Sequence, residues 1–307
     1  MIHAFDSELV KLARLDEQVV IIGADDGRFR PMVPEGMKDR YLNVGIAECN
    51  AIGVAAGLSC CNKIPFVTAG GTFLVHRANE FIRDDVCMQN RNVKMIAVGA
   101  GLAMNALGNT QHMTEDVATL RAMPNLTIMT AATPREAVLM ARAAYEVEGP
   151  VYIRLGRHEG RDVYQDKELK FQIGKAQLVC EGRDISIITS GTILSDVLDI
   201  LPELDRKGIC AEVINMHTIK PIDRDMIIHA VEHTGKILVV EEHSVIGGLR
   251  GAIAEVLTEE GIMPALRYMG LNDCFARGYG SYKDIKRKNG LSLDDIIKQA
   301  LRLAAGN

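Results

Sequence analysis

The hydrophobic positions of this 307-residue chain form short apolar runs that alternate with longer stretches of helical spacing. In the first half we predict buried strands at 19–24, 64–69, 93–99, 126–131 and 151–156. Helical patterns separate them and are predicted at 48–61, 73–89, 115–122 and 134–147. Such alternation is typical of a mostly parallel sheet covered by helices.

A polar, charged segment interrupts this pattern from about residue 157 to residue 173. A second series follows, with strands predicted at 184–190, 210–215, 236–242 and 264–270 and helices at 192–206, 222–234, 247–260 and 292–305. We therefore predict an α/β fold of two domains, each a mostly parallel sheet flanked by helices. The domains are expected at 1–160 and 174–307, joined by a linker at 161–173.

Local signals mark where several helices begin. Thr133 can cap the helix that starts at Pro134, and Glu136 would complete a capping box. Ser292 and Asp295 give the last helix a similar start. The first 18 residues have an amphipathic helical pattern and lack the charged and apolar regions of a signal peptide.

Composition narrows the classes of function. The net charge of -5 gives no reason to expect nucleic acid or an anionic membrane as a partner, and Trp is absent. No apolar run is long enough to cross a bilayer. Seven cysteines, an odd number with no C-x-x-C pair, argue against a disulfide framework or a zinc site. We expect free thiols and a cytoplasmic location.

One carboxylate stands out among small and apolar residues in "NVGIAECNAIGVAAGLS", which runs from 43 to 59. If this segment is helical, Glu48 shares a face with Ala51, Ile52 and Ala55. The helix is apolar nearly all round, so we expect it to be buried. A buried carboxylate requires a partner or a chemical task. The alternative is an ordinary acid in the first turn, favoured by the helix dipole.

The same segment resembles the glutamate motif of the pyrimidine-binding domain in transketolase-like thiamine diphosphate enzymes. Further segments resemble that family in the same order along the chain: "IIGADDGRF", "PFVTAGGTFLVHRANEFIRDDV", "GLAMNALGNTQHMTEDVATLRAMPNLTIMTAATPREA" and "GPVYIRLGR". In the second domain, "NMHTIKPID" and "VVEEHSVIGGL" resemble the family's C-terminal domain. The likeness covers nearly the whole chain.

The resemblance implies roles for residues around the cofactor. Glu48 would hydrogen-bond the aminopyrimidine ring of thiamine diphosphate and promote loss of the proton from its thiazolium carbon. Phe73 would stack on the pyrimidine, and Asp25 would sit near the cofactor. His76, one turn after Phe73, would line the pocket, unless it is a solvated histidine.

The family's diphosphate-binding domain has no counterpart here. That domain carries Gly-Asp-Gly and a later Asn that hold Mg²⁺ and the diphosphate, and no "GDG" occurs in this sequence. We therefore assign no metal ligand to this chain. It resembles the second half of a split transketolase, which implies a separate N-terminal subunit with the Gly-Asp-Gly motif. A dimer of this chain within an α₂β₂ assembly is expected.

The substrate side departs from the family. Gln111 and His112 are exchanged relative to the usual Thr-His-Gln order, while Leu107 and Gly99 replace an Asp and a His. Arginines remain near the matched loops, and Arg157 matches the anion-contacting arginine. Substrate contacts are expected from Gln111, His112, Arg157, Arg154 and Arg28, with Arg30, Arg77 and His158 nearby. Guanidinium groups suit planar or tetrahedral anions, so we infer an anionic sugar.

The resemblance thus implies transfer of a two-carbon ketol unit from an anionic ketose to an aldose. The E1 β subunit of a 2-oxo acid dehydrogenase has the same layout and is an alternative. A deoxyxylulose-phosphate synthase-like enzyme is another. A non-catalytic partner subunit is the third, because of the substitutions at Gly99, Leu107 and Gln111.

Overall fold

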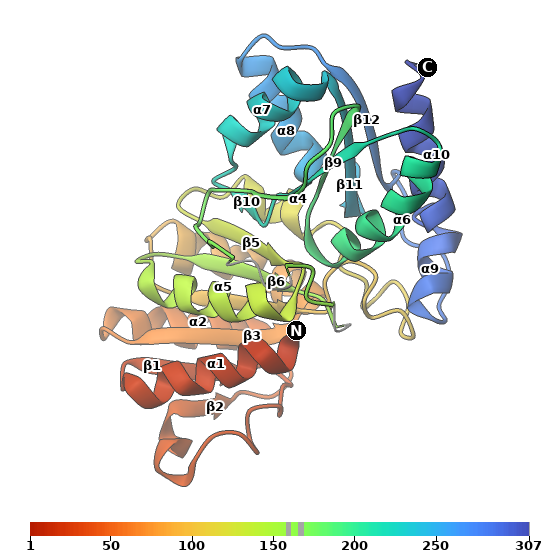
Figure 1. The fold of residues 1–307 in the computed structure, drawn as a ribbon. Helices are drawn as coiled ribbons and strands as arrows, with labels where there is room; N and C mark the ends of the chain where they lie inside the picture. The colour runs from red at the N-terminus through yellow and green to blue at the C-terminus, as the bar shows by residue number, and fades with distance from the viewer. Residues whose placement is uncertain (158–160, 165–168, 307) are drawn as a thin grey trace.

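The chain folds into two α/β units, seen in a computed structural model that describes residues 1–157, 161–164 and 169–306 (Figure 1). The first unit holds a seven-stranded sheet of order β10-β5-β6-β4-β3-β1-β2, parallel except for β10. Its strands are β1 (Val19–Gly23), β2 (Tyr41–Asn43), β3 (Ile64–Gly70), β4 (Lys94–Val98), β5 (Thr127–Ala131), β6 (Val151–Leu155) and β10 (Thr218–Lys220).

Helices cover both faces of this first sheet. They are α1 (Ile2–Leu15), α2 (Glu48–Cys60), α3 (Asn79–Phe81), α4 (Asp116–Arg121) and α5 (Pro134–Glu146). Successive side chains of a strand point to opposite faces. Ile21 accordingly joins a core cluster with Phe5 of α1, whereas Ile22 joins a cluster with Ile52 of α2. The apolar runs are therefore buried on both sides, as the sequence predicts.

The second unit is a five-stranded sheet of order β12-β11-β8-β9-β7, parallel except for β7. Its strands are β7 (Gln177–Cys180), β8 (Ile185–Thr189), β9 (Ala211–Asn215), β11 (Lys236–Ser244) and β12 (Ala265–Leu271). The helices are α6 (Leu194–Arg206), α7 (Arg224–Thr234), α8 (Leu249–Glu259), α9 (Tyr282–Lys288) and α10 (Leu293–Ala304). The predicted fold class is confirmed.

The structure differs from the predicted elements mainly at the sheet edges. Strands β2, β7 and β10 are each three or four residues long, too short for a periodic signal. Strand β10 comes from the second half of the chain but pairs antiparallel with β5 of the first sheet. The predicted helix at 73–89 consists of two π-helical segments, Phe73–Arg77 and Ile82–Cys87, on either side of α3.

The caps of two helices can be compared directly with the predictions. Thr133 Oγ1 accepts from the Glu136 backbone N–H at 3.1 Å. The Glu136 carboxylate, however, accepts from the N–H of Ala132 at 2.8 Å, one residue before the cap. Ser292 and Asp295 form a complete capping box at the start of α10.

One prediction about α2 is wrong. The face that carries Glu48 is buried, with Ala51, Ile52 and Ala55 fully covered. On the opposite side Gly57 is exposed and Val54 is only half-buried. The helix is therefore not enclosed all round in this chain, since a Cβ added at Gly57 would meet no atom within 4 Å.

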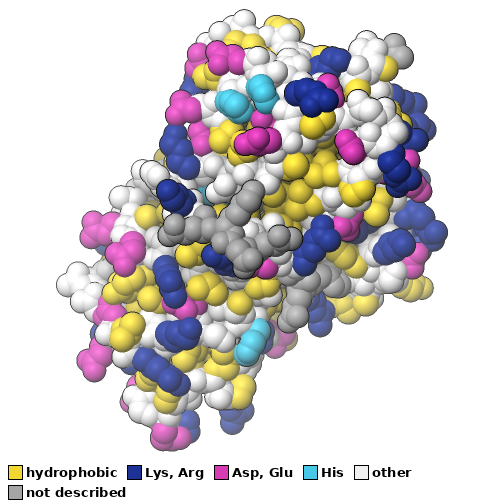
Figure 2. Space-filling view, viewed as in Figure 1, with side chains coloured by type: hydrophobic (Ala, Val, Ile, Leu, Met, Phe, Trp, Pro, Cys, Tyr) yellow, Lys and Arg dark blue, Asp and Glu magenta, His cyan; other side chains and the backbone are white. Residues whose placement is uncertain are grey.

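The segment between the two sheets is anchored where it is described. The Tyr164 hydroxyl donates to Glu136 of α5 and accepts from Asn215 Nδ2 at 2.8 Å. Phe171 stacks on His217 with ring centroids 4.5 Å apart. On the face shown in Figure 2, cationic and anionic side chains are interspersed rather than gathered by sign. Among the described helices, none has the length and apolar character needed to cross a bilayer.

Candidate functional site

A cavity of about 500 Å³ lies at the carboxyl ends of β1, β3 and β4. This edge is where open parallel sheets commonly bind ligands. The lining residues come from four places: the loop after β1, the start of α2, the end of β3 with its following segment, and the loop after β4. They include Asp25, Asp26, Arg28, Glu48, Gly70, Phe73, Arg77, Val98, Met104 and Gln111.

Glu48 is the first residue of α2 and only 2% exposed. Its Oε2 accepts from Arg77 Nη1 at 2.5 Å. The Arg77 guanidinium also lies over the ring of Phe73, 5.0 Å from the ring centroid. The carboxylate of Glu48 thus stands at a helix N-terminus and also lines the cavity.

The cavity wall beside Glu48 is made of small residues and one aromatic ring. A Cβ added at Gly70 would lie 3.2 Å from Phe73 Cδ2, so the absence of a side chain there makes room for the ring. Asp25 also lines the cavity and adopts a left-handed conformation with φ of 51°. Its backbone N–H donates to the Gly45 carbonyl at 2.8 Å, which fixes this turn.

Arg28 joins two carboxylates behind the cavity. Its Nε and Nη2 donate to Asp26 at 2.8 Å each, and its Nη1 donates to Asp6 of α1 at 2.9 Å. Burial acts to raise the pKa of Asp26, but Arg28 and the Thr68 hydroxyl outweigh it and hold the pKa below its ordinary value. For Asp6, burial prevails over Arg28 and raises the pKa to about 7. Arg28 is thus held in place before any ligand binds.

A second hollow of about 370 Å³ continues on the far side of Arg28. Its lining includes His3, Asp6, Arg28, Met32 and Arg157. Arg157 is exposed, and its Nη1 lies 3.7 Å from Met104 Sδ. Arg28 lines both hollows, so two of the arginines predicted to contact an anion, Arg28 and Arg157, lie along one surface.

Gly99 is one of the residues that differ from the family pattern, and its surroundings show what takes the place of a larger side chain. Gly99 has φ of 92°, and a Cβ there would lie 2.6 Å from Met104 Cγ. Met104 therefore packs where a larger side chain at 99 would stand, and it lines the cavity with Gln111. Leu107 is 55% exposed and is not among the lining residues.

Two predicted contacts lie away from the cavity lining. The exposed His76 has its Nε2 3.6 Å from Glu115 Oε1. His112 is 3% exposed, and burial lowers its pKa. Its Nδ1 lies 3.4 Å from Asn109 Oδ1, while its Nε2 has no hydrogen-bond partner in the described part of the chain.

Arg154 is at odds with its predicted contact to substrate. It is 4% exposed, and its Nε donates to Asp116 at 2.8 Å. Its Nη2 donates to the carbonyls of Met113 at 2.9 Å and Glu242 at 3.1 Å. Arg154 therefore holds the two units together, because its strand ends beneath the second unit. His158, also expected near the site, lies outside the described residues.

Sequence reasoning missed Asp26 and Met104 and left Arg77 without a role. Asp26 carries the same signal as Asp25, an acid directly after a strand, and the choice between them needs the left-handed turn. His76 and Arg77 lie three and four residues after Phe73, so either could face the cavity. In the π-helical segment Phe73–Arg77 it is Arg77 that points toward Glu48. Nothing in the sequence indicated Met104.

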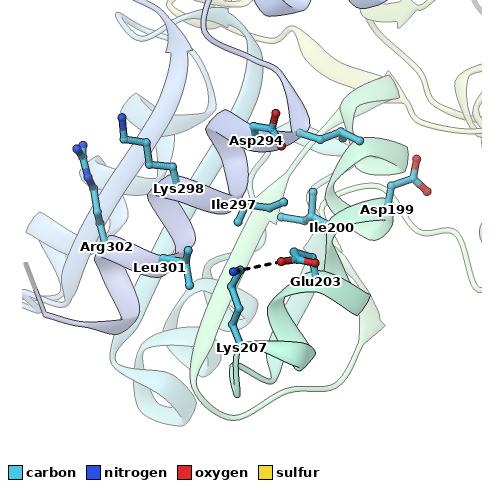
Figure 3. Close-up of a pocket in the computed structure, with 10 residues that line it drawn as sticks. Asp199, Ile200, Glu203, Lys207, Asp294, Ile297, Lys298, Leu301 and Arg302 are labelled. Atoms are coloured by element: carbon cyan, nitrogen blue, oxygen red, sulfur yellow. Dashed lines mark ion pairs between the residues drawn. The ribbon is translucent and has the colours of Figure 1, made fainter.

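A larger hollow, of about 600 Å³, lies between α6 and α10 in the second unit (Figure 3). Its charged side chains belong to helix surfaces, with Glu203 and Lys207 paired at 3.2 Å one turn apart. The labelled apolar residues in Figure 3 are those with which the two helices pack, such as Ile200 and Ile297. We assign the site to the smaller cavity because it contains a buried carboxylate beside an aromatic ring.

Two family models match successive parts of the chain. The transketolase pyrimidine-binding domain model matches residues 1–162, and the transketolase C-terminal domain model matches residues 174–296. A subunit of the apulose-4-phosphate transketolase of Phocaeicola vulgatus is 34% identical over 304 residues, covering 97% of this chain and 95% of that protein. The 6-deoxy-6-sulfo-D-fructose transketolase subunit SqwH of Clostridium sp. is 35% identical over 302 residues, covering 95% and 90%.

A solved structure described as a split gene transketolase, inactive beta4 tetramer, superposes with a TM-score of 0.89. It is 35% identical in sequence, and the alignment covers 98% of this chain and 97% of that one. The fold therefore matches over nearly the full length of both chains.

Proposed function

This chain belongs to the transketolase family, and from that premise we propose that it is the C-terminal subunit of a split, thiamine diphosphate-dependent transketolase. It would transfer a two-carbon ketol unit from an anionic ketose to an aldose, together with a separate subunit. The observation that carries the proposal is the buried carboxylate of Glu48 at the wall of a cavity that also contains Phe73.

The lining of this cavity fits the pyrimidine ring of the cofactor. Phe73 offers an aromatic face, Gly70 leaves space beside it, and Glu48 presents a carboxylate at the edge. Thiamine diphosphate, when bound, supplies the nucleophilic carbon that accepts the two-carbon unit. Glu48 would share a proton with a ring nitrogen, and burial keeps that proton from exchanging freely with water. Arg77, whose side chain is 46% exposed, can swing outward as the ring enters.

The other part of the site is proposed to come from a partner. Among the described residues, the cavity contains no group of three side chains placed to hold a metal ion. Mg²⁺ and the diphosphate would be held mainly by an N-terminal subunit that carries the Gly-Asp-Gly motif. We propose an α₂β₂ assembly in which this chain forms the central dimer. The seven free cysteines fit a reducing compartment, and we propose the cytoplasm.

The charges behind the cavity favour a donor with an anionic end. Arg28 lines both hollows and Arg157 lines the second, so an anion at the far end of the sugar would meet two guanidinium groups. On the cavity wall, Met104 fills the space beside Gly99, and Gln111 stands where the family pattern has a histidine. The names of the two related subunits indicate a phosphorylated and a sulfonated sugar. We propose a ketose with a terminal phosphate or sulfonate as donor.

The test is reconstitution with the proposed partner. The purified chain, its Gly-Asp-Gly partner and their mixture are assayed with apulose 4-phosphate and 6-deoxy-6-sulfo-D-fructose as donors, with thiamine diphosphate and Mg²⁺ present. Only the mixture should turn over. Glu48→Gln should lower kcat by about 10²–10⁴-fold, because proton transfer is lost. Glu35→Gln removes an exposed carboxylate and should leave kcat unchanged.

Other outcomes would point elsewhere. Ketol transfer by the chain alone would refute the split site. Unaltered turnover in Glu48→Gln would remove the role assigned to that carboxylate. Decarboxylation of a 2-oxo acid by the mixture, without ketol transfer, would favour the E1 β alternative. A mixture inactive with every donor, although it binds thiamine diphosphate, would favour a non-catalytic partner.

A further inference from the structure

Two histidines and a glutamate meet in the second unit, far along the chain from the cavity residues. His229 and His233 lie one turn apart on α7, with rings stacked at 5.3 Å between centroids. Glu212 lies on β9, the strand beneath them. Figure 2 shows two histidine side chains next to each other on the surface over α7.

The polar atoms of these three side chains lie close to one another. Glu212 Oε2 lies 3.1 Å from His229 Nε2 and 3.1 Å from His233 Nδ1. These three ligand atoms all lie within 4.8 Å of one another. In a tetrahedral zinc site with bonds of about 2.0–2.1 Å, ligand atoms are separated by roughly 3.3 Å. An ion can therefore be placed among the three atoms with small side-chain movements.

The buried position of the Glu212 carboxylate favours a positive charge beside it. The residue is 1% exposed, and burying a carboxylate is unfavourable unless a cation compensates it. No lysine or arginine pairs with it in the described part of the chain. The Ser186 hydroxyl donates to its other oxygen, Oε1, at 2.7 Å. That contact fixes the carboxylate so that Oε2 faces the two imidazoles, as a positioning partner does in metal sites.

We propose that Glu212, His229 and His233 form a binding site for a divalent transition-metal ion, of the class that zinc represents. Two imidazoles and one carboxylate are a common zinc ligand set, and they do not suit Mg²⁺, which prefers oxygen ligands. The imidazole side chains are 46% and 43% exposed, so the remaining coordination position opens to water. The ion would tie α7 to β9 and leave the transferase cavity untouched.

The test is zinc binding by the full chain, purified without a histidine tag. Calorimetry should show one Zn²⁺ per chain, and Zn²⁺ but not Mg²⁺ should raise Tm. His229→Gln and His233→Gln should each weaken binding by about 10-fold or more, since losing a ligand costs at least as much as losing its hydrogen-bonded support. These side chains are exposed, so the variants should fold. Glu232→Gln, an exposed acid on the same helix, should bind as the wild type does.

Exposed thiols are the main competing source of zinc binding, because Cys60, Cys61 and Cys274 are all exposed. Co²⁺ distinguishes the two, since thiolate ligands give a charge-transfer band in the near ultraviolet and a nitrogen–oxygen site does not. Visible cobalt bands without that feature, lost in the double variant His229→Gln/His233→Gln, are expected. Zinc binding unchanged in the double variant, a thiolate band, or no binding at all would each overturn the proposal.

Discussion

The two parallel sheets of this chain differ in what covers the carboxyl ends of their strands. At the ends of β1, β3 and β4 the first sheet leaves a cavity of about 500 Å³. At the end of β11 the second sheet packs against the first unit. There the Ser244 N–H donates to the Thr114 carbonyl at 2.6 Å, and Glu242 accepts from the Leu102 N–H at 3.2 Å.

Strand ends therefore provide a site in this fold only where no other element covers them. Even within the first sheet, β6 ends under the second unit, and Arg154 there is engaged by Asp116 and Glu242. The cavity contains a similar arginine–carboxylate pair, Arg77 with Glu48, at 2.5 Å. Side-chain exposure separates the two arginines, at 5% for Arg154 and 46% for Arg77.

The largest expected effect comes from breaking the closed junction. Arg154→Met should lower the free energy of unfolding by about 3–5 kcal/mol, because it leaves Asp116 buried without its cation. Urea denaturation followed by circular dichroism measures this. Arg161→Met is the matched control, since Arg161 pairs with Asp199 at 2.8 Å but is 57% exposed. Its effect should stay below about 1 kcal/mol. Equal losses of stability in the two variants would contradict the difference expected between a buried and an exposed ion pair.

A smaller effect should appear with pH at His217, which stacks on Phe171 of the segment between the two sheets. Burial lowers the pKa of His217 to about 4, against the opposing charge of Asp223. The folded-state pKa lies below the unfolded value of about 6.5, so stability is fully present above about pH 6.5 and is lost as the pH falls toward 4. Between pH 7.5 and 5 this histidine should account for about 2 kcal/mol of the loss.

His217→Gln should flatten that part of the stability profile, whatever its stability at pH 7.5. Urea denaturation at a series of pH values gives the slope for both proteins. His3→Gln serves as the control, because His3 is exposed and should leave the slope as it is. An identical slope in wild type and His217→Gln would show that the buried ring is not responsible.

The smallest effect is expected at the open cavity. Arg77→Met should lower the free energy of unfolding by only about 1 kcal/mol, because the arginine is 46% exposed and Glu48 faces a solvent-filled cavity. In a Glu48→Gln background the same change should cost less, since the carboxylate it compensates is gone. A double-mutant cycle measures this coupling. A coupling free energy as large as the Arg154→Met effect would mean that solvent screens the Arg77–Glu48 pair no more than it screens the buried Arg154–Asp116 pair.

Much of the fold could be predicted because its signals are local. Apolar runs such as 19–24 and 126–131 became strands almost residue for residue, since burial on both faces requires continuous apolar sequence. The short strands β2, β7 and β10 could not be found this way. Strand β10 exists because β5 offers it a free edge, which is a property of the assembled sheet.

Some of the predicted site residues line the cavity and others do not, because the sequence shows local patterns but not contacts between distant segments. Glu48, Phe73, Asp25, Gln111 and Arg28 all line the cavity, and Arg157 lines the hollow beside it. Arg154 fits its motif equally well, yet it is buried in the junction. The two histidines of α7 have the spacing of metal ligands in sequence, but their third partner, Glu212, lies on another element.

Local sequence patterns were enough to predict the order of strands and helices along the chain, the family likeness and the types of side chain at the site. Those follow from periodicity and from residues close together in the chain. Which charged side chains meet depends on the folded chain. Arg77 faces Glu48, Arg28 bridges Asp6 and Asp26, and Arg154 crosses between the units because segments distant in sequence pack there. Charge pairing depends on distance and burial, and a linear sequence specifies neither until the chain folds.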